Sequence, residues 1–230
     1  MSNFDEIAKG YASIINSTLA IDGDNMLEYF TMYKTYYIQD IVKQLQRKKT
    51  IIKILDYGCG VGTLSQALYN NIPGISLHGY DISEESIANV PKGLKIGDNK
   101  FTSNLEVLDY DYDLSILCNV MHHVDLGDRS AVLESIKHRL SKRGLLLMIE
   151  HNMLNPLTRK SVIDCPFDQD AHMLTMGEAS KLLINAGFGR QLRRYITFFP
   201  PRFSALRVLD KYIGWIPLGA QYMVCAKQSD

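Results

Sequence analysis

Apolar and polar positions follow two different periods along this chain. Over residues 26–49 apolar and aromatic side chains recur at close to helical spacing and a basic turn ends the segment, which predicts an amphipathic helix. From residue 50, short apolar runs stopped by glycine or aspartate alternate with helical segments. We predict strands at 50–58, 75–81, 99–103, 112–120 and 144–152, and helices at 64–74, 83–90 and 128–140.

This alternation stops after residue 150. Residues 151–175 are rich in Asn, Pro and Asp, which predicts a loop or a broken helix, and a loop of that length usually has a function. A helix at 176–188 and strands at 190–199 and 220–228 complete the pattern. Strands that alternate with helices predict an α/β fold, with a Rossmann-like, doubly wound, mostly parallel sheet that helices cover on both faces.

Composition narrows the class of partner. Lys plus Arg number 25 and Asp plus Glu number 25, so the chain lacks the broad basic surface that nucleic acid requires, and we expect a small-molecule partner. The four cysteines show no C-x-x-C spacing and are expected to be free thiols. The N-terminus lacks a signal-peptide pattern, and the sequence has no apolar run long enough to predict a transmembrane segment. We therefore expect a cytoplasmic protein.

The strongest local signal is "ILDYGCGVG" at residues 54–62. Gly58, Gly60 and Gly62 lie between a predicted strand and a predicted helix, where bare backbone and a helix N-terminus can hold a ligand. A dinucleotide-binding turn needs G-x-G-x-x-G, but here the third glycine comes one residue early, with Thr63 in its place. The acid Asp56, just before the turn, suits a ligand with an ammonium or sulfonium charge, and we identify that ligand as S-adenosylmethionine.

The stretch "LDYGCGVG" resembles motif I of the class I S-adenosylmethionine-dependent methyltransferases, and the resemblance extends along nearly the whole chain. It implies seven strands with an antiparallel last strand, and an acid, here Asp81, that binds both ribose hydroxyls. Asp81 would also serve as a helix cap. The resemblance further implies a cofactor-binding set made of Asp56, Gly58, Cys59, Gly60, Gly62, Asp81, Ile82, Ser103, Asn119, Val120 and Tyr33. At the adenine edge the contact could come from Thr102 or Asn104 instead of Ser103. Near the first helix it could come from Lys34 instead of Tyr33, or the tyrosines of this helix could simply be its packed face.

Catalytic candidates follow the predicted fourth and fifth strands. His151 comes directly after the fifth strand, where it could take a proton from an attacking hydroxyl, and His122 is the second catalytic candidate, ahead of its neighbour His123. Glu150 could orient His151, or pair with Arg159 or Lys160. The expected substrate-binding residues are Glu150, Asn152, Asp168 and His172.

Two polar or aromatic segments have alternative interpretations. The stretch "DCPFDQDAH" could be read as a metal cluster, but its spacing matches no known metal loop, so we expect a polar lid over the substrate and no metal. The aromatic and basic residues of 195–219 could form a membrane-surface or hydrophobic-substrate patch, but at that density we expect them to be core.

The sequence therefore predicts one methyltransferase domain over residues 1–230. It would comprise a helical N-terminal lid (1–48), a cofactor-binding half (49–150) and a substrate side with the last two strands (151–230). The tail resembles a subgroup of bacterial small-molecule methyltransferases, which implies O-methylation of a sugar or secondary metabolite, with S-adenosylhomocysteine as product. The alternatives are an NAD(P)-dependent oxidoreductase and a non-catalytic S-adenosylmethionine-binding module.

Overall fold

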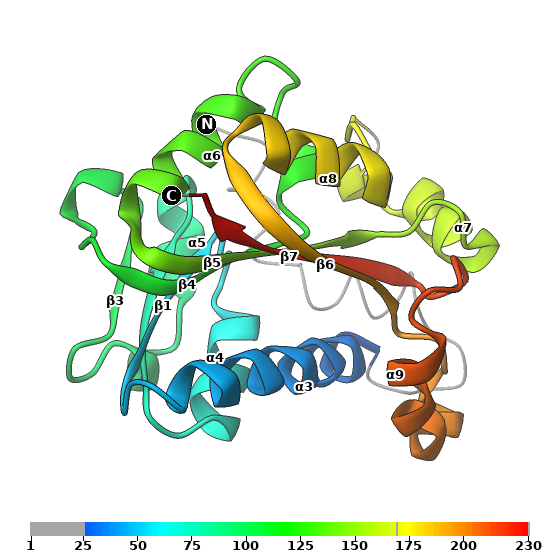
Figure 1. The fold of residues 1–230 in the computed structure, drawn as a ribbon, viewed down its shortest axis with the longest axis horizontal. Helices are drawn as coiled ribbons and strands as arrows, with labels where there is room; N and C mark the ends of the chain where they lie inside the picture. The colour runs from blue at the N-terminus through cyan, green and yellow to red at the C-terminus, as the bar shows by residue number, and fades with distance from the viewer. Residues whose placement is uncertain (1–25, 169, 230) are drawn as a thin grey trace.

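The computed structural model describes residues 26–168 and 170–229. The part of the predicted lid before residue 26 lies outside the described residues. The centre of the fold is a seven-stranded sheet in the order β3-β2-β1-β4-β5-β7-β6 (Figure 1). Its strands are β1 (Ile52–Tyr57), β2 (Ile75–Tyr80), β3 (Lys100–Thr102), β4 (Tyr112–Cys118), β5 (Leu140–His151), β6 (Phe188–Ile196) and β7 (Gln221–Gln228).

The sheet is parallel except at one strand. The pairs β1 with β2, β1 with β4, β2 with β3 and β4 with β5 are parallel, while β7 runs antiparallel to both β5 and β6. This confirms the predicted Rossmann-like, doubly wound sheet with an antiparallel last strand.

Helices cover both faces of the sheet. Figure 1 shows α3 (Met26–Gln46) and α4 (Thr63–Asn71) on one face, and α6 (Arg129–Arg139) and α8 (Met176–Asn185) on the other. Because consecutive strand residues point to opposite faces, Ile54 packs in the core beneath α3 and α4, while its neighbour Leu55 packs in the core beneath α6 and α8. The short helix α5 (Glu84–Asn89) follows β2.

One strand boundary differs from the prediction. Strand β5 begins at Leu140, because Leu140 already pairs with Tyr112 before the register shifts and continues at Leu145. The segment 151–175 contains α7 (Pro156–Asp164), which agrees with the predicted broken helix, and the Asn155 side chain caps its first turn.

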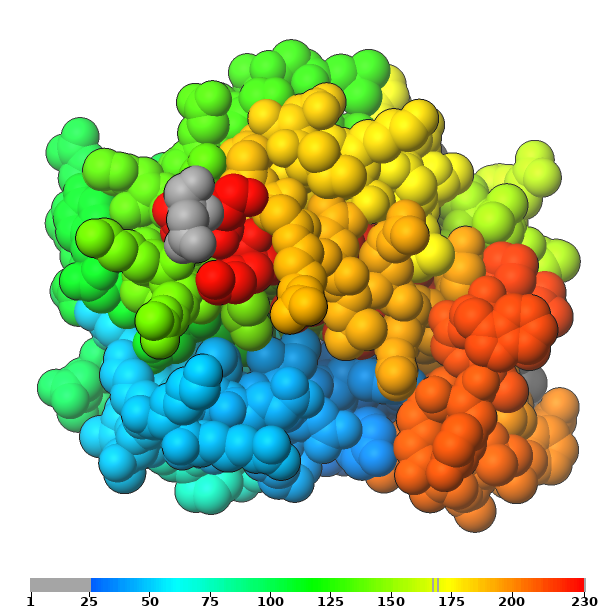
Figure 2. Space-filling view, in the orientation of Figure 1, coloured from blue at the N-terminus to red at the C-terminus, as the bar shows by residue number. Residues whose placement is uncertain are grey.

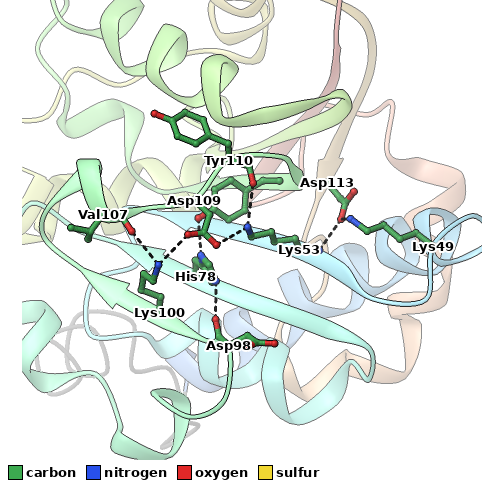
Figure 3. A network of polar contacts seen from close by, with 10 residues as sticks. Lys49, Lys53, His78, Asp98, Lys100, Val107, Asp109, Tyr110 and Asp113 are labelled. Atoms are coloured by element: carbon green, nitrogen blue, oxygen red, sulfur yellow. Dashed lines mark hydrogen bonds and ion pairs between the residues drawn. The ribbon is translucent and has the colours of Figure 1, made fainter.

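The amino-terminal edge of the sheet holds a network of charged side chains (Figure 3). The Lys53 ammonium lies 2.7 Å from one carboxylate oxygen of Asp109, and the Lys100 ammonium lies 3.1 Å from the other. The buried imidazole of His78 bridges Tyr112 and the main chain at Asp98. The network joins the amino-terminal ends of β1, β3 and β4 to His78 in the middle of β2. It lies at the edge of the sheet opposite the glycine turn.

The segment between β6 and β7 forms an exposed surface. It contains η5 (Pro201–Leu209) and α9 (Asp210–Ile213), drawn in orange in Figure 2. The prediction that this aromatic region is core is wrong for Phe203, Tyr212 and Trp215, because η5 and α9 lie outside the sheet and Trp215 is 78% exposed. Among the residues that the structure describes, no helix combines the length and apolar character needed to cross a membrane.

Candidate active site

The glycine turn follows β1 and leads into α4. Gly58, Gly60 and Gly62 all have positive φ, at 80°, 53° and 81°, so each adopts a backbone conformation that favours glycine. A Cβ on Gly58 would lie 2.4 Å from a methyl carbon of Val120, whereas a Cβ on Gly60 would meet no atom within 4 Å. The turn is therefore packed on one side against the residue that follows β4 and open at Gly60.

Asp81 lies at the carboxyl end of β2 and ties this turn in place. One carboxylate oxygen of Asp81 accepts a hydrogen bond from Gly60 N at 2.8 Å, and the other accepts from Ser83 N at 2.9 Å. The cap of α5 is Ser83, whose hydroxyl accepts from Ser86 N. Ile82 is 71% exposed beside the acid, where it presents an apolar face.

Asp56 lies beneath the turn and is almost fully buried. Its carboxylate accepts a hydrogen bond from the Ser65 hydroxyl of α4 at 2.6 Å. Burial and the nearby charge of Asp81 raise the pKa of Asp56 to about 6, although the Ser65 hydrogen bond and the Lys34 ammonium act against that rise. Burial also raises the pKa of the Cys59 thiol, which keeps it neutral.

The carboxyl end of β4 supplies the opposite wall. Asn119 has a φ of 55°, its main-chain N donates to Ile149 O at 2.9 Å, and its side-chain oxygen accepts from the Gln221 amide at 3.1 Å. A non-glycine residue in this conformation is uncommon and is held here by β5 and β7. Ser103, the residue after β3, is half-buried.

These residues fit S-adenosylmethionine. The open space at Gly60 lies at the carboxyl ends of parallel strands, where open α/β sheets bind ligands, and a carboxylate adjoins it. A cavity of about 280 Å³ lies beside Asn119 and is lined by residues of α3 and α7. Its walls are mainly apolar, from Met26, Leu27, Tyr29, Phe30, Leu157, Val162, Phe198, Phe199 and Pro200. Its ionisable lining groups include Lys34, His122, His123, His151 and Asp168.

The two ring nitrogens of His122 each face a carboxylate. Its Nδ1 bonds the carboxylate of Glu150, which also accepts from Met121 N at 2.8 Å and from Val120 N at 3.2 Å. His122 Nε2 lies 3.4 Å from Asp168 Oδ1. Burial alone would lower the pKa of His122, but the two carboxylates outweigh burial and raise it to about 9.

The pKa values of the other two histidines in the cavity, His123 and His151, are shifted in the opposite direction. Burial, reinforced by the charge of His122, lowers the pKa of His151 to about 4 and that of His123 to about 4. The rings of His122 and His151 lie 5.4 Å apart between centroids. Because its pKa is about 4, the His151 imidazole is neutral at pH 7, and it lines the cavity as a free base.

Comparison with known proteins decides the family. The sequence model of a family described as "Methyltransferase domain" matches residues 55–146, the part that contains the glycine turn, Asp81 and the β4 end. Residues 55–146 therefore match a methyltransferase domain, and together with the fold this supports a class I S-adenosylmethionine-dependent methyltransferase. This confirms the predicted family, enzyme class and cofactor. No curated protein sequence matches the methyltransferase.

Solved structures share the fold of the methyltransferase at low sequence identity. A Thermotoga maritima methyltransferase described as a possible histamine N-methyltransferase is 15% identical, covers 98% of each chain and has a TM-score of 0.66. The plantazolicin methyltransferase BpumL, solved with S-adenosylhomocysteine, is 18% identical over 98% of this chain and 97% of its own, with a TM-score of 0.60. The CurJ carbon methyltransferase is 15% identical over 85% of this chain and 54% of its own, with a TM-score of 0.61.

Several predicted site residues lie together in the methyltransferase. Asp81 and the glycines meet at one strand edge, and Asn119, His122, His151 and Asp168 line one cavity. Glu150 is buried behind His122 and orients that ring, not His151. It also does not pair with Lys160, whose ammonium lies 2.7 Å from Asp164.

Three other predicted residues point elsewhere. The buried Tyr33 hydroxyl bonds Asp210, whereas the adjacent Lys34 lines the cavity. Asn152 uses its amide to bond the carbonyls of Gly219 and Pro217, which anchors the loop before β7. His172 is exposed, and its main-chain N donates to His122 O at 2.8 Å.

Sequence reasoning missed two parts of the cavity wall. Phe198, Phe199 and Pro200, just after β6, and Gln221, the first residue of β7, all line the cavity. The "FFPP" run is a recognisable turn signal after a strand. The side of the sheet to which this turn leads, however, depends on where β6 joins the sheet.

Proposed function

We propose that this methyltransferase methylates a hydroxyl group of a small acceptor with a largely apolar body. The observation that carries the proposal is the cavity next to Asn119, whose walls are mostly apolar and whose lining contains the imidazole of His151, a neutral base because burial lowers its pKa to about 4. A volume of about 280 Å³ suits a small ligand, since binding pockets are commonly about 300–1,000 Å³.

The chain contributes positioning and proton transfer. The turn of Gly58–Gly62 and Asp81 would hold the cofactor, which supplies a methyl group on a sulfonium when it is bound. Direct displacement requires the acceptor oxygen to be in line with that methyl group, and such alignment accounts for a large part of catalysis. His151 would accept the hydroxyl proton as the oxygen attacks, because a neutral ring is already available to receive it.

Of the two acceptor classes that the sequence suggests, a sugar and a secondary metabolite, the cavity favours the secondary metabolite. An unmodified sugar would leave several hydroxyls against apolar walls without hydrogen-bond partners, at a cost of about 1–3 kcal/mol each. A phenolic or otherwise apolar metabolite would bury its body against Phe30, Leu157 and Phe198 and present one hydroxyl to His151.

Turnover of a panel of phenols, hydroxy acids, sugars, amines and carbon acids tests the proposal. S-adenosylhomocysteine formation would be measured and the methylated atom assigned by NMR. We expect O-methylation of an apolar alcohol or phenol, and about a 100-fold or greater loss of kcat for His151→Ala with unchanged cofactor affinity. His138→Ala, on the exposed side of α6, is the matched control. Turnover of amines or carbon acids alone would refute the hydroxyl assignment, and full activity of His151→Ala would refute the role of His151.

A further inference from the structure

The imidazoles of His122 and His123 meet the carboxylate of Asp168 at the cavity wall. These three residues each offer one ligand atom, and the three atoms lie within 4.8 Å of one another. We propose that His122, His123 and Asp168 bind one divalent transition-metal ion. This proposal does not rest on the identity of the acceptor.

The spacing of the ligand atoms suits an ion. Asp168 Oδ1 is 3.4 Å from His122 Nε2 and 3.5 Å from His123 Nε2. Two ligands that each lie about 2.1 Å from a tetrahedral ion are about 3.4 Å apart. Charge-assisted hydrogen bonds between nitrogen and a carboxylate are about 2.7–2.9 Å long. The carboxylate is therefore too far from either ring for a strong direct bond, and at the right distance to share an ion with both.

The surroundings of His122 match those of a metal ligand. Metal-binding histidines usually donate their second ring nitrogen to a carboxylate or carbonyl, which fixes the ring and the tautomer. Here Nδ1 of His122 bonds Glu150, and Glu150 is itself held by the main-chain N of Met121 and Val120. The His122 ring is thereby held with Nε2 directed at Asp168.

The site is formed by segments far apart in the sequence. His122 and His123 belong to the 3-10 helix η3 (Met121–His123) after β4, and Asp168 ends η4 (Pro166–Asp168) after α7. The main-chain N of His172 donates to His122 O, which brings the segment after η4 against η3. Of the acidic stretch considered in the sequence, Asp168 alone belongs to the three-residue group.

The ligand set selects the type of ion. Two imidazoles and one carboxylate suit Zn²⁺, Fe²⁺, Mn²⁺ or Co²⁺, whereas Mg²⁺ and Ca²⁺ prefer oxygen ligands. All three side chains line the cavity, so an ion bound by them would keep a coordination position open to it. An acceptor oxygen or a water molecule could occupy that position.

Titration of tag-free, chelator-stripped full-length protein with Co²⁺ tests the site without cofactor or acceptor. We expect one equivalent to bind, with visible absorption of a nitrogen and oxygen ligand field and no thiolate charge-transfer band. Asp168→Ala and His123→Ala should each weaken binding at least tenfold. His138→Ala is the matched control and should bind as the unmodified protein does, and excess Mg²⁺ should not compete.

Three results would overturn the proposal. They are the absence of saturable Co²⁺ binding, equal binding by the unmodified protein and both cluster variants, and a thiolate band that assigns the ion to a cysteine. Thermal unfolding of each variant would show that it is folded, and two independent cluster variants keep the test decisive if one of them fails to fold. Methyl transfer in the presence of chelator would then report whether the ion takes part in turnover.

Discussion

Replacing Asp56 with asparagine should stabilise the protein at neutral pH. The carboxyl group is 2% exposed and has a pKa of about 6 in the folded state, compared with an ordinary value of 3.8. The difference of about 2 pH units corresponds to roughly 3 kcal/mol, at about 1.4 kcal/mol per unit. The folded state holds this proton more tightly than the unfolded state does. The favourable contribution is therefore complete below about pH 4 and is lost as pH rises through about 6.

Urea unfolding of the unmodified protein and Asp56→Asn at pH 4.5 and pH 7.5 measures this effect. Packing differences between the two side chains are common to both pH values, so the informative quantity is the change in the stability difference with pH. We expect Asp56→Asn to gain about 2 kcal/mol relative to the unmodified protein between pH 4.5 and pH 7.5.

Ser65→Ala gives an independent check in the opposite direction. The Ser65 hydroxyl donates to the ionised carboxylate, so its removal should raise the pKa of Asp56 further and increase the loss of stability at pH 7.5. Parallel stability profiles for the unmodified protein and Asp56→Asn would refute the reasoning, because they would mean that the carboxyl group titrates alike in the folded and unfolded states.

Three further predictions concern the turn, the cofactor and the far edge of the sheet. Gly58→Ala should destabilise by about 2–4 kcal/mol in chemical unfolding, since a Cβ there meets Val120 at positive φ, whereas Gly60→Ala in open space should cost about 1–2 kcal/mol; equal losses would contradict the packing argument. Asp81→Ala should weaken S-adenosylmethionine binding about tenfold or more in calorimetry, and unchanged affinity would remove this residue from the cofactor site. At the far edge, the Lys53 hydrogen bond lowers the pKa of Asp109 to about 2, so its contribution is present above pH 4 and lost as pH falls through about 2. Because the Asp109 side chain is 43% exposed, Asp109→Asn should cost less than about 1 kcal/mol at pH 7 and only a small part of that at pH 2, where half of the folded molecules are protonated; a loss at pH 2 as large as at pH 7 would rule out the ion pair as its cause.

Local sequence patterns predicted the sheet well because buried strands and glycine turns have strong local causes. The run 50–58 is apolar since β1 is covered on both faces, and Gly58 is required by positive φ together with contact from Val120. The start of β5 was missed because Lys142 and Arg143 are polar and exposed, although they continue the strand.

Side-chain partners were harder to predict where they join distant segments. The bond from Tyr33 to Asp210 spans 177 positions, and no periodicity reports it. For Glu150, however, the sequence did show that His151 could not be its partner. Residues 150 and 151 are consecutive on a strand, so their side chains point to opposite faces, and Glu150 could not orient His151. The side chain that Glu150 does orient is His122, in the 3-10 helix η3 that follows β4.

The position of β7 sets an order for folding during protein synthesis. β6 lies at the edge of the sheet with β7 as its neighbour, and β7 separates it from β5. Because β7 comprises Gln221–Gln228, a ribosome must translate the chain through β7 before β6 can be hydrogen-bonded into the sheet. The five strands β1 to β5 have no such requirement. They can associate while β6 and β7 are still being translated. Until β7 arrives, the edge of β5 stays unpaired, so a nascent or truncated chain would expose a long strand edge suited to aggregation or to capture by chaperones.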